Sequence, residues 1–332
     1  MINKVIPNTV FIYLTEKCNL SCDYCYFRDK RNRTLTFSTV KNFLDYFKSN
    51  PPKYFEISGG EPLIFWPLVK KIVAYLHRFF DNAEVGIQTN GLFLDKDKIS
   101  FIKANNLTLE IGLDGDYDST SAHREDIDRR RFDILIDDVC NCIKEGIDLS
   151  CTMTIHPHEV EKLVKNFIFL KNLGLKSIDV TPAAFMQWSR ESITTFKKNY
   201  YEIIKDKSNR ERIFADEDII FLDKFTLDFS LHPPGYVFCG DAYLCLPEAA
   251  RKKFSVLDFD ASRPFNRKIF SFYIEQYEKY LNKLKRKVTY RDYVSASFKI
   301  ISLLTSERYL NVEEMIDFHN FLKKVHLQHM RG

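Results

Sequence analysis

The chain has 332 residues, of which 45% are hydrophobic, and its 29 Phe and 17 Tyr are enough for a large buried core. Its formal net charge of +4 is too small to indicate a nucleic-acid partner. No apolar run reaches the length that spans a membrane, and no targeting signal is evident. These features predict a globular protein with neither a nucleic-acid nor a membrane partner.

The first predicted strand, 9–14, leads directly into three cysteines, Cys18, Cys22 and Cys25, spaced C-x3-C-x2-C. Three thiolates on one loop can hold three irons of a [4Fe-4S] cluster, whereas an electron-transfer cluster normally has four cysteine ligands. The fourth iron is then open to a small molecule. Zinc is a weaker alternative, because structural zinc wants four ligands and the nearest downstream histidine is His77. A disulfide framework is unusual in a chain of this size, and a chance spacing stays open.

Three further strand ends carry motifs. The second strand, 53–58, ends in Gly59-Gly60-Glu61-Pro62, where glycines let the backbone approach a ligand closely. The third, 84–89, ends in Thr89-Asn90-Gly91, and the fourth, 107–113, ends in Gly112-Leu113-Asp114-Gly115 and is followed by His123-Arg124. Together with the cysteine loop, over roughly residues 8 to 185, this set resembles the radical S-adenosylmethionine (SAM) superfamily, in its peptide-modifying and sulfatase-maturing branch.

The resemblance implies a [4Fe-4S] cluster on Cys18, Cys22 and Cys25, with SAM bound at the open iron. It implies that Arg124 contacts the SAM carboxylate and that Tyr24 lies near the adenine. The other implied cofactor-binding residues are Gly59, Gly60, Glu61, Pro62, Thr89, Asn90 and Asp114. One departure is Gly112, which stands where relatives carry a serine that often contacts SAM.

Strands and helices alternate along the first half of the chain. The predicted strands are 9–14, 53–58, 84–89, 107–113, 148–155 and 175–181, and the predicted helices are 38–49, 66–80, 95–105, 131–145 and 160–173, with Ser38 as the first N-cap. Six βα units predict a parallel sheet. Several strands alternate apolar with polar residues, which predicts one face toward helices and one toward a ligand. The predicted inward set is Glu56, Ser58, Gln88, Glu110, Asp114, Thr152 and Asp179.

The expected fold class is α/β, a partial (β/α)6 TIM-like barrel with a C-terminal extension that is mixed and then helical. Three domains are expected: a radical SAM core barrel (1–188), a helix with a degenerate twitch/SPASM-like segment (189–260), and a helical region with cationic character (261–332). The step Cys239-Gly240, with Cys245, resembles the start of a twitch or SPASM domain. The two cysteines are candidates for a second iron–sulfur cluster. Alternatively, Cys239 or Cys245 is a free thiol that gives a hydrogen atom to a substrate radical, or both are packed in a degenerate β-hairpin. Cys140, Cys142 and Cys151 are assigned to packing.

The expected activity is reductive cleavage of SAM to a 5′-deoxyadenosyl radical, followed by abstraction of a hydrogen atom from a peptide during ribosomal-peptide maturation. Glu110 or Asp179 is the candidate base. The expected partners are the peptide and an external electron donor of flavodoxin or ferredoxin type. Because the motif begins at residue 18, either a separate leader-binding protein or the basic C-terminal region is expected to recognise the leader. A small-molecule substrate and a non-catalytic iron–sulfur scaffold are the alternatives. An exposed cluster and a carbon radical need a reducing setting, which predicts a cytoplasmic location.

Overall fold

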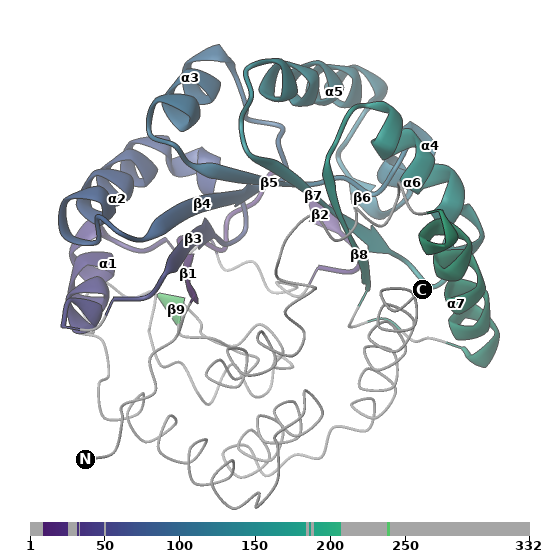
Figure 1. Cartoon of the computed structure of the whole chain (residues 1–332), viewed down its shortest axis with the longest axis horizontal. Helices are drawn as coiled ribbons and strands as arrows, with labels where there is room; N and C mark the ends of the chain where they lie inside the picture. The colour runs from purple at the N-terminus through teal and green to yellow at the C-terminus, as the bar shows by residue number, and fades with distance from the viewer. Residues whose placement is uncertain are drawn as a thin grey trace, which may run out of the picture. The chain divides into compact units, whose positions relative to one another are not determined.

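The computed structural model describes residues 9–25, 32, 34–49, 51–183, 186, 189–206 and 238–239 (Figure 1). The described residues belong to two compact units, whose boundaries fall after Lys17, after Cys25 and after Val85. Cys18–Cys25 thus belongs to the unit that also contains residues 86–206, and each unit is described in turn.

The first unit is built on two parallel strands, β1 (Thr9–Tyr13) and β3 (Tyr54–Ser58), with the short β9 (Phe238–Cys239) parallel to β1. Its helical segments are α1 (Phe37–Leu44), η1 (Asp45–Phe47), η2 (Pro62–Phe65) and α2 (Trp66–Phe79). Val10 and Ile12 of β1 pair with Phe55 and Ile57 of β3, and all four side chains are fully buried. This row of apolar residues is the core against which α1 and α2 pack, as the amphipathic periods of the two helices require.

The second unit contains four parallel strands in the order β4 (Glu84–Thr89), β5 (Thr108–Gly112), β7 (Leu149–Ile155) and β8 (Ser177–Pro182). Its helices are α3 (Lys96–Ala104), α4 (Tyr117–His123), α5 (Arg129–Lys144), the 3-10 turn η3 (Val160–Lys162), α6 (Leu163–Asn172) and α7 (Arg190–Lys205). Helices α3, α5, α6 and α7 line one side of these strands (Figure 1). A separate antiparallel pair joins β2 (Ser21–Cys22) to β6 (Arg124–Glu125).

Short polar side chains start α1, α3, α4, α5 and α7, each accepting a hydrogen bond from a backbone N–H of the first turn, whereas α2 and α6 have no such cap. Helix α1 begins this way at Thr36, whose backbone is extended and whose hydroxyl accepts from the N–H of Thr39 at 3.2 Å. The prediction of Ser38 as this N-cap is wrong, because Ser38 already lies inside the first helical turn. The other caps of this kind are Asp95, Asp116, Asp128 and Ser189.

The predicted alternation along the strands is confirmed in β5 and β7. Leu149, Cys151, Met153 and Ile155 are buried, whereas the intervening Ser150, Thr152 and Thr154 are only partly covered. In β5, Leu109 and Ile111 are buried and the residues between and beside them are half-buried. Because neighbouring parallel strands keep their faces in register, one face of this unit carries a continuous apolar layer and the opposite face carries polar side chains.

Six parallel strands, each followed by a helix, confirm the predicted α/β class, and each predicted strand overlaps an observed one. Helix α4 and the strands β2 and β6 were not predicted, because seven- and two-residue elements carry too little pattern to be recognised. The predicted C-terminal extension, apart from α7 and β9, lies outside the described residues. Among the described residues, no helix is both long enough and apolar enough to cross a membrane.

Candidate active site

The three predicted cluster ligands lie on one short loop of the second unit. Cys18, Cys22 and Cys25 form no disulfide, and each is partly exposed. Cys22 belongs to β2 and lies opposite Arg124 of β6, and a turn follows in which the N–H of Cys25 donates to the carbonyl of Cys22 at 3.1 Å. The loop therefore presents its three sulfurs from a backbone that is fixed by strand pairing and a tight turn.

Two N–H groups point at the sulfur of Cys18. The backbone N–H of Leu20 donates to Sγ at 3.4 Å, and Asn90 Nδ2 donates to the same atom at 3.6 Å. Asn90 also donates to Asn19 Oδ1 at 2.9 Å, so it contacts the loop twice. N–H donors to thiolate sulfur are a general feature of iron–sulfur sites, where they tune the cluster and orient its ligands.

The three cysteine thiols are close enough to one another to interact electrostatically. Burial raises the pKa of Cys22 to about 11; the Arg124 charge opposes this, while Cys25, Asp114 and Cys18 add to it. A thiol of this kind keeps its proton until a metal displaces it, since thiolate ligation releases the proton. Three cysteine sulfurs on one loop, with amide donors beside Cys18, fit the soft ligand set of an iron–sulfur cluster.

Arg124, Asp114 and Tyr24 form a buried hydrogen-bonded network next to this loop. Arg124 donates from Nε and Nη2 to the two oxygens of Asp114 at 2.7 and 2.8 Å, and Tyr24 donates to Asp114 Oδ2 at 2.5 Å. The backbone N–H of Thr154 supplies a fourth bond, to Oδ1, at 3.0 Å. Asp114 is 4% exposed and Arg124 6% exposed, so the ion pair is shielded from water.

Electrostatics hold this network in one protonation state. Burial opposes the charge on Arg124, but attraction to Asp114 outweighs it and raises the pKa of Arg124 above its usual value. Burial is also the main cause that raises the pKa of Tyr24, which keeps its proton and remains a donor to Asp114. Asp114 thus acts as a structural acceptor for its neighbours. Within the described residues, Arg124 Nη1 makes no hydrogen bond and stays available to a ligand carboxylate.

Gly112 has a structural role in this network. A Cβ placed on Gly112 would lie 3.1 Å from both Nη1 and Nη2 of Arg124. The guanidinium group therefore packs against the bare backbone of Gly112. The glycine that departs from the family's serine makes room for the arginine that pairs with Asp114.

The Gly59-Gly60-Glu61-Pro62 turn belongs to the first unit and packs against the segment that leads into the cysteine loop. The N–H of Gly60 donates to the carbonyl of Thr15 at 2.6 Å, and the N–H of Glu61 donates to that of Lys17 at 2.7 Å. A Cβ on Gly60 would overlap the Lys17 carbonyl, and Gly59 has φ +138°. The close approach that these glycines permit is thus to Thr15–Lys17, directly before Cys18. Glu61 is fully buried and caps η2 by accepting from the N–H of Leu63 at 2.9 Å.

The Thr89-Asn90-Gly91 segment is a compact turn of the second unit. Thr89 Oγ1 accepts from the N–H of Gly91, and Asn90 Oδ1 accepts from the N–H of Leu92, both at 3.0 Å. Thr89 is therefore used in shaping the turn, whereas Asn90 reaches the cysteine loop.

A row of polar side chains runs across the strands of the second unit. Glu110 Oε1 accepts from Gln88 Nε2 at 2.6 Å and from Thr152 Oγ1 at 2.5 Å, which places three members of the predicted inward set together. Asp179 lies beside Thr152 in the strand register but bonds locally, accepting from Thr181 Oγ1 at 2.8 Å. Of the two candidate bases, Glu110 is the one held at the centre of the row.

Of the two candidate ligands of a second cluster, Cys239 and Cys245, the structure describes only the first. Cys239 lies in β9, where it pairs with Ile12 of β1 in the first unit. Cys245 lies outside the described residues, so the candidate second cluster stays a prediction.

Three residues near the cysteine loop were not singled out from the sequence as a group. Asp23, His123 and His156 bring their side-chain ligand atoms within 4.8 Å of one another. They come from the cysteine loop, the end of α4 and the residue after β7. The sequence does place each of these residues at the carboxyl end of a strand or beside a motif. That the three side chains meet can be seen only in the folded structure.

Comparison with known families assigns the first half of the chain. Residues 12–170 match the model of the radical SAM superfamily, which covers the cysteine loop, the glycine turn and strands β1 to β7. Enzymes of that superfamily use a [4Fe-4S] cluster and SAM, and the donor set described above fits both.

Curated relatives match over part of their length. The chain is 34% identical over 110 residues to an uncharacterised protein of Methanocaldococcus jannaschii and spans 38% of it. It is 29% identical over 234 residues to GTP 3′,8-cyclase of Campylobacter fetus, which is 62% of this chain and 68% of that enzyme. A third match is the serine-type anaerobic sulfatase-maturating enzyme of Bacteroides thetaiotaomicron, 24% identical over 50% of this chain and 43% of that one.

Among solved structures, the enzyme anSMEcpe with bound AdoMet and a Cp18Cys peptide is similar in fold. The TM-score is 0.60 at 15% identity, covering 93% of this chain and 99% of that one. The likeness agrees with the predicted radical SAM barrel class.

Proposed function

Residues 12–170 form a radical SAM domain, and from it we propose that the chain cleaves SAM reductively and removes a hydrogen atom from a peptide substrate. The observation that carries the proposal is the C-x3-C-x2-C loop, whose Cys18 sulfur accepts from Asn90 and whose Cys22 pairs with Arg124 of β6. When bound, the cluster and SAM supply the electron and the 5′-deoxyadenosyl radical that such chemistry needs.

The chain's own residues hold and orient these groups. Cys18, Cys22 and Cys25 are the proposed iron ligands, with Asn90 and the N–H of Leu20 bonded to the Cys18 sulfur. Arg124 is proposed to bind the SAM carboxylate through Nη1, because Asp114 already uses its Nε and Nη2. In this role Asp114 fixes the direction of the guanidinium group before any ligand arrives.

The roles proposed for the two strand-end turns rest on the family motif and on local geometry. The Gly59–Pro62 turn is assigned to the amino group of SAM. Its backbone is fixed by the bonds of Gly60 and Glu61 to Thr15 and Lys17, so it is shaped in advance. A pre-shaped turn avoids the ordering cost that a flexible one would incur on binding.

Glu110 is proposed to face the substrate. Its Oε1 accepts two hydrogen bonds, from Gln88 and Thr152, which fixes the carboxylate in one orientation. Within the part of the chain that the structure describes, Oε2 makes no hydrogen bond, and it can accept an N–H from a bound peptide. A carboxylate fixed in this way can also take a proton from the substrate, provided that the substrate places that proton within hydrogen-bond reach.

A peptide substrate is favoured by two relatives, the sulfatase-maturating enzyme and the peptide-bound anSMEcpe structure. The match to GTP 3′,8-cyclase favours a second candidate, a nucleotide substrate. The basic surplus of the last 72 residues, which lie outside the described part, is compatible with an acidic ligand of either kind.

The first prediction concerns cleavage of SAM. Anaerobically reconstituted, dithionite-reduced protein should form 5′-deoxyadenosine and methionine from SAM, quantified by liquid chromatography and mass spectrometry. Cys22→Ala should abolish both products, because two thiolates cannot hold the three irons. Cys140→Ala, a helical cysteine away from the loop, is the matched control and should retain them. Undiminished cleavage by Cys22→Ala would contradict the proposal.

The substrate class is decided in the same assay. GTP and short peptides encoded beside the gene are added separately, and deuterium-labelled peptide is followed into 5′-deoxyadenosine. Label transfer from a peptide supports the proposal, whereas stimulation and label transfer with GTP alone would replace it with the nucleotide reading.

A further inference from the structure

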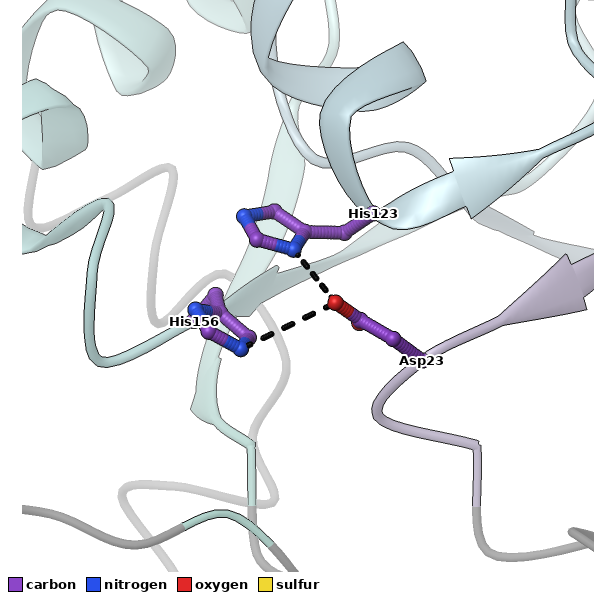
Figure 2. A group of neighbouring side chains, drawn as sticks. All are labelled: Asp23, His123 and His156. Atoms are coloured by element: carbon purple, nitrogen blue, oxygen red, sulfur yellow. Dashed lines mark hydrogen bonds and ion pairs between the residues drawn. The ribbon is translucent and has the colours of Figure 1, made fainter.

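Three segments that are distant in sequence meet beside the cysteine loop. Asp23 lies between Cys22 and Cys25, His123 is the last residue of α4, and His156 directly follows β7. Figure 2 shows the Asp23 carboxylate beside the two imidazole rings, with a dashed contact to each ring. We call these three residues the Asp23 cluster; all belong to the second unit.

Asp23 is bound to His123 by both its backbone and its side chain. The N–H of Asp23 donates to the carbonyl of His123 at 3.1 Å, and Asp23 Oδ2 lies 2.8 Å from His123 Nδ1. The backbone bond continues the pairing of β2 with β6 by one residue, because Ser21 and Cys22 already pair with Glu125 and Arg124. The cysteine loop is therefore fixed to this strand on both sides of Cys22.

His156 packs against the ring of His123. Its ring stacks on that of His123, with centroids 3.9 Å apart and planes 16° from parallel. His156 is 3% exposed, and its Nδ1 accepts from the backbone N–H of His158 at 3.2 Å. An acceptor at Nδ1 places the proton of the neutral ring on Nε2. That Nε2 faces Asp23 Oδ2 at 3.9 Å, beyond hydrogen-bond length.

The same geometry disfavours a metal ion among these residues. An imidazole ligand holds a metal in its ring plane about 2 Å from the nitrogen. Two nearly parallel rings stacked at 3.9 Å cannot both direct an in-plane lone pair at one ion. In addition, His156 Nε2 carries the proton and has no lone pair to offer. Burial lowers the pKa of His156, which keeps the stacked ring neutral.

We propose that His123 and His156 are positioning residues, which fix the cluster-binding loop through Asp23 and so govern how firmly the protein retains its iron–sulfur cluster. His123 supplies the bond, and His156 fixes the plane of the His123 ring. This inference rests on the proposed function in assuming that the loop carries a cluster. The three cysteines do not by themselves explain the shape of the loop, whereas the contacts of Asp23 with the two histidines do.

The test measures retention of the cluster rather than catalysis. Reconstituted wild type, His123→Ala, His156→Ala and His156→Phe are mixed anaerobically with an iron chelator, and released iron is followed in time. His123→Ala and His156→Ala should lose iron about 10-fold faster, the size expected when a residue that orients a metal ligand is removed. His156→Phe keeps a flat ring for stacking and should fall close to wild type. His77→Ala, an exposed histidine on α2, is the matched control and should behave as wild type.

A second measurement separates this inference from the proposed function. Hydrogen exchange of the cluster-free protein should be faster in residues 18–25 of His123→Ala and His156→Ala than of His77→Ala, with the rest of the fold unchanged. If the wild type takes up no cluster, the proposed function fails, and hydrogen exchange still decides the positioning role.

Two results would overturn the inference. One is iron loss and loop exchange in the two alanine variants equal to those of His77→Ala. The other is a stoichiometric divalent ion, retained by the Cys18→Ala/Cys22→Ala/Cys25→Ala variant and lost on further change of His156 to Ala, which would make these residues a metal site.

Discussion

At the scale of single residues, the glycine turn and the buried arginine show two different uses of missing side chains. Gly60 is needed because the carbonyl of Lys17 occupies the place of a Cβ, whereas a Cβ on Gly112 would make a tight 3.1 Å contact with the end of the Arg124 side chain. The Gly59–Pro62 motif predicts a ligand beside Gly60. The structure adds that the turn is also braced by the chain that leads into the cysteines.

A substitution at Gly60 tests this bracing. Gly60→Ala should lower the urea midpoint strongly, because the new methyl group meets rigid backbone and displaces the segment before Cys18. Gly146→Ala is the control, since Gly146 has φ +71° but nothing within 4 Å, so it should cost only about 1–2 kcal/mol of backbone strain. Equal losses of stability in the two variants would show that no such contact exists.

Residue roles were predictable where a strand pattern fixed them. The alternation along the strands predicted that Gln88, Glu110 and Thr152 share a face, and their hydrogen bonds confirm it. The Asp23–His123 contact joins residues 100 positions apart and could not be read from spacing. Likewise, Arg124 was linked to a ligand by resemblance, whereas its pairing with Asp114 depends on how α4 returns the chain to the strand ends.

At the scale of elements, boundaries followed from capping chemistry and periodicity. Strand positions were predicted well because each strand carries an apolar or alternating pattern that ends at a turn signal. The start of α1 was placed two residues late, because Ser38 is a good capping residue by type but Thr36 has the extended backbone that an N-cap needs. The short elements α4, β2 and β6 were missed, although they carry much of the candidate site.

The junction of α1 and α2 offers a pH-dependent prediction. Asp45, which begins η1, accepts from Lys41 Nζ at 2.6 Å, pairs with Lys48 Nζ at 2.7 Å and accepts from the Tyr75 hydroxyl. Partial burial opposes ionisation of the carboxyl, but these partners outweigh it and lower the pKa of Asp45. The stabilisation is therefore present above the unfolded value, about pH 4, and is lost as the pH falls further.

Asp45→Asn should accordingly reduce the free energy of unfolding at pH 7 by about 1 kcal/mol or less, since the lysines are largely exposed. The difference from wild type, measured by urea unfolding at several pH values, should shrink below about pH 4. Asp137→Asn, an exposed position on α5, serves as control. A difference that stays constant down to strongly acidic pH would contradict this role of the carboxylate.

At the scale of the whole molecule, the cysteine loop and Arg124 belong to one compact unit and the Gly59–Pro62 turn belongs to the other. Six βα repeats and the match over residues 12–170 agree on a radical SAM domain in the first half of the chain. The expected twitch/SPASM-like segment and helical region, 189–260 and 261–332, fall mainly outside the described residues. The proposed substrate class therefore rests on Glu110 and on the relatives. The chain spans 38% to 68% of the length of the three curated relatives.

The central claim is that Cys18, Cys22 and Cys25 hold a [4Fe-4S] cluster whose fourth iron is open to SAM. The most direct measurement is the electron paramagnetic resonance spectrum of the reduced, reconstituted protein before and after SAM is added. The wild type and Cys140→Ala should show a reduced-cluster signal that changes shape with SAM, and Cys22→Ala should show none. A wild-type signal that SAM leaves unchanged, or an intact four-iron signal in Cys22→Ala, would contradict the claim.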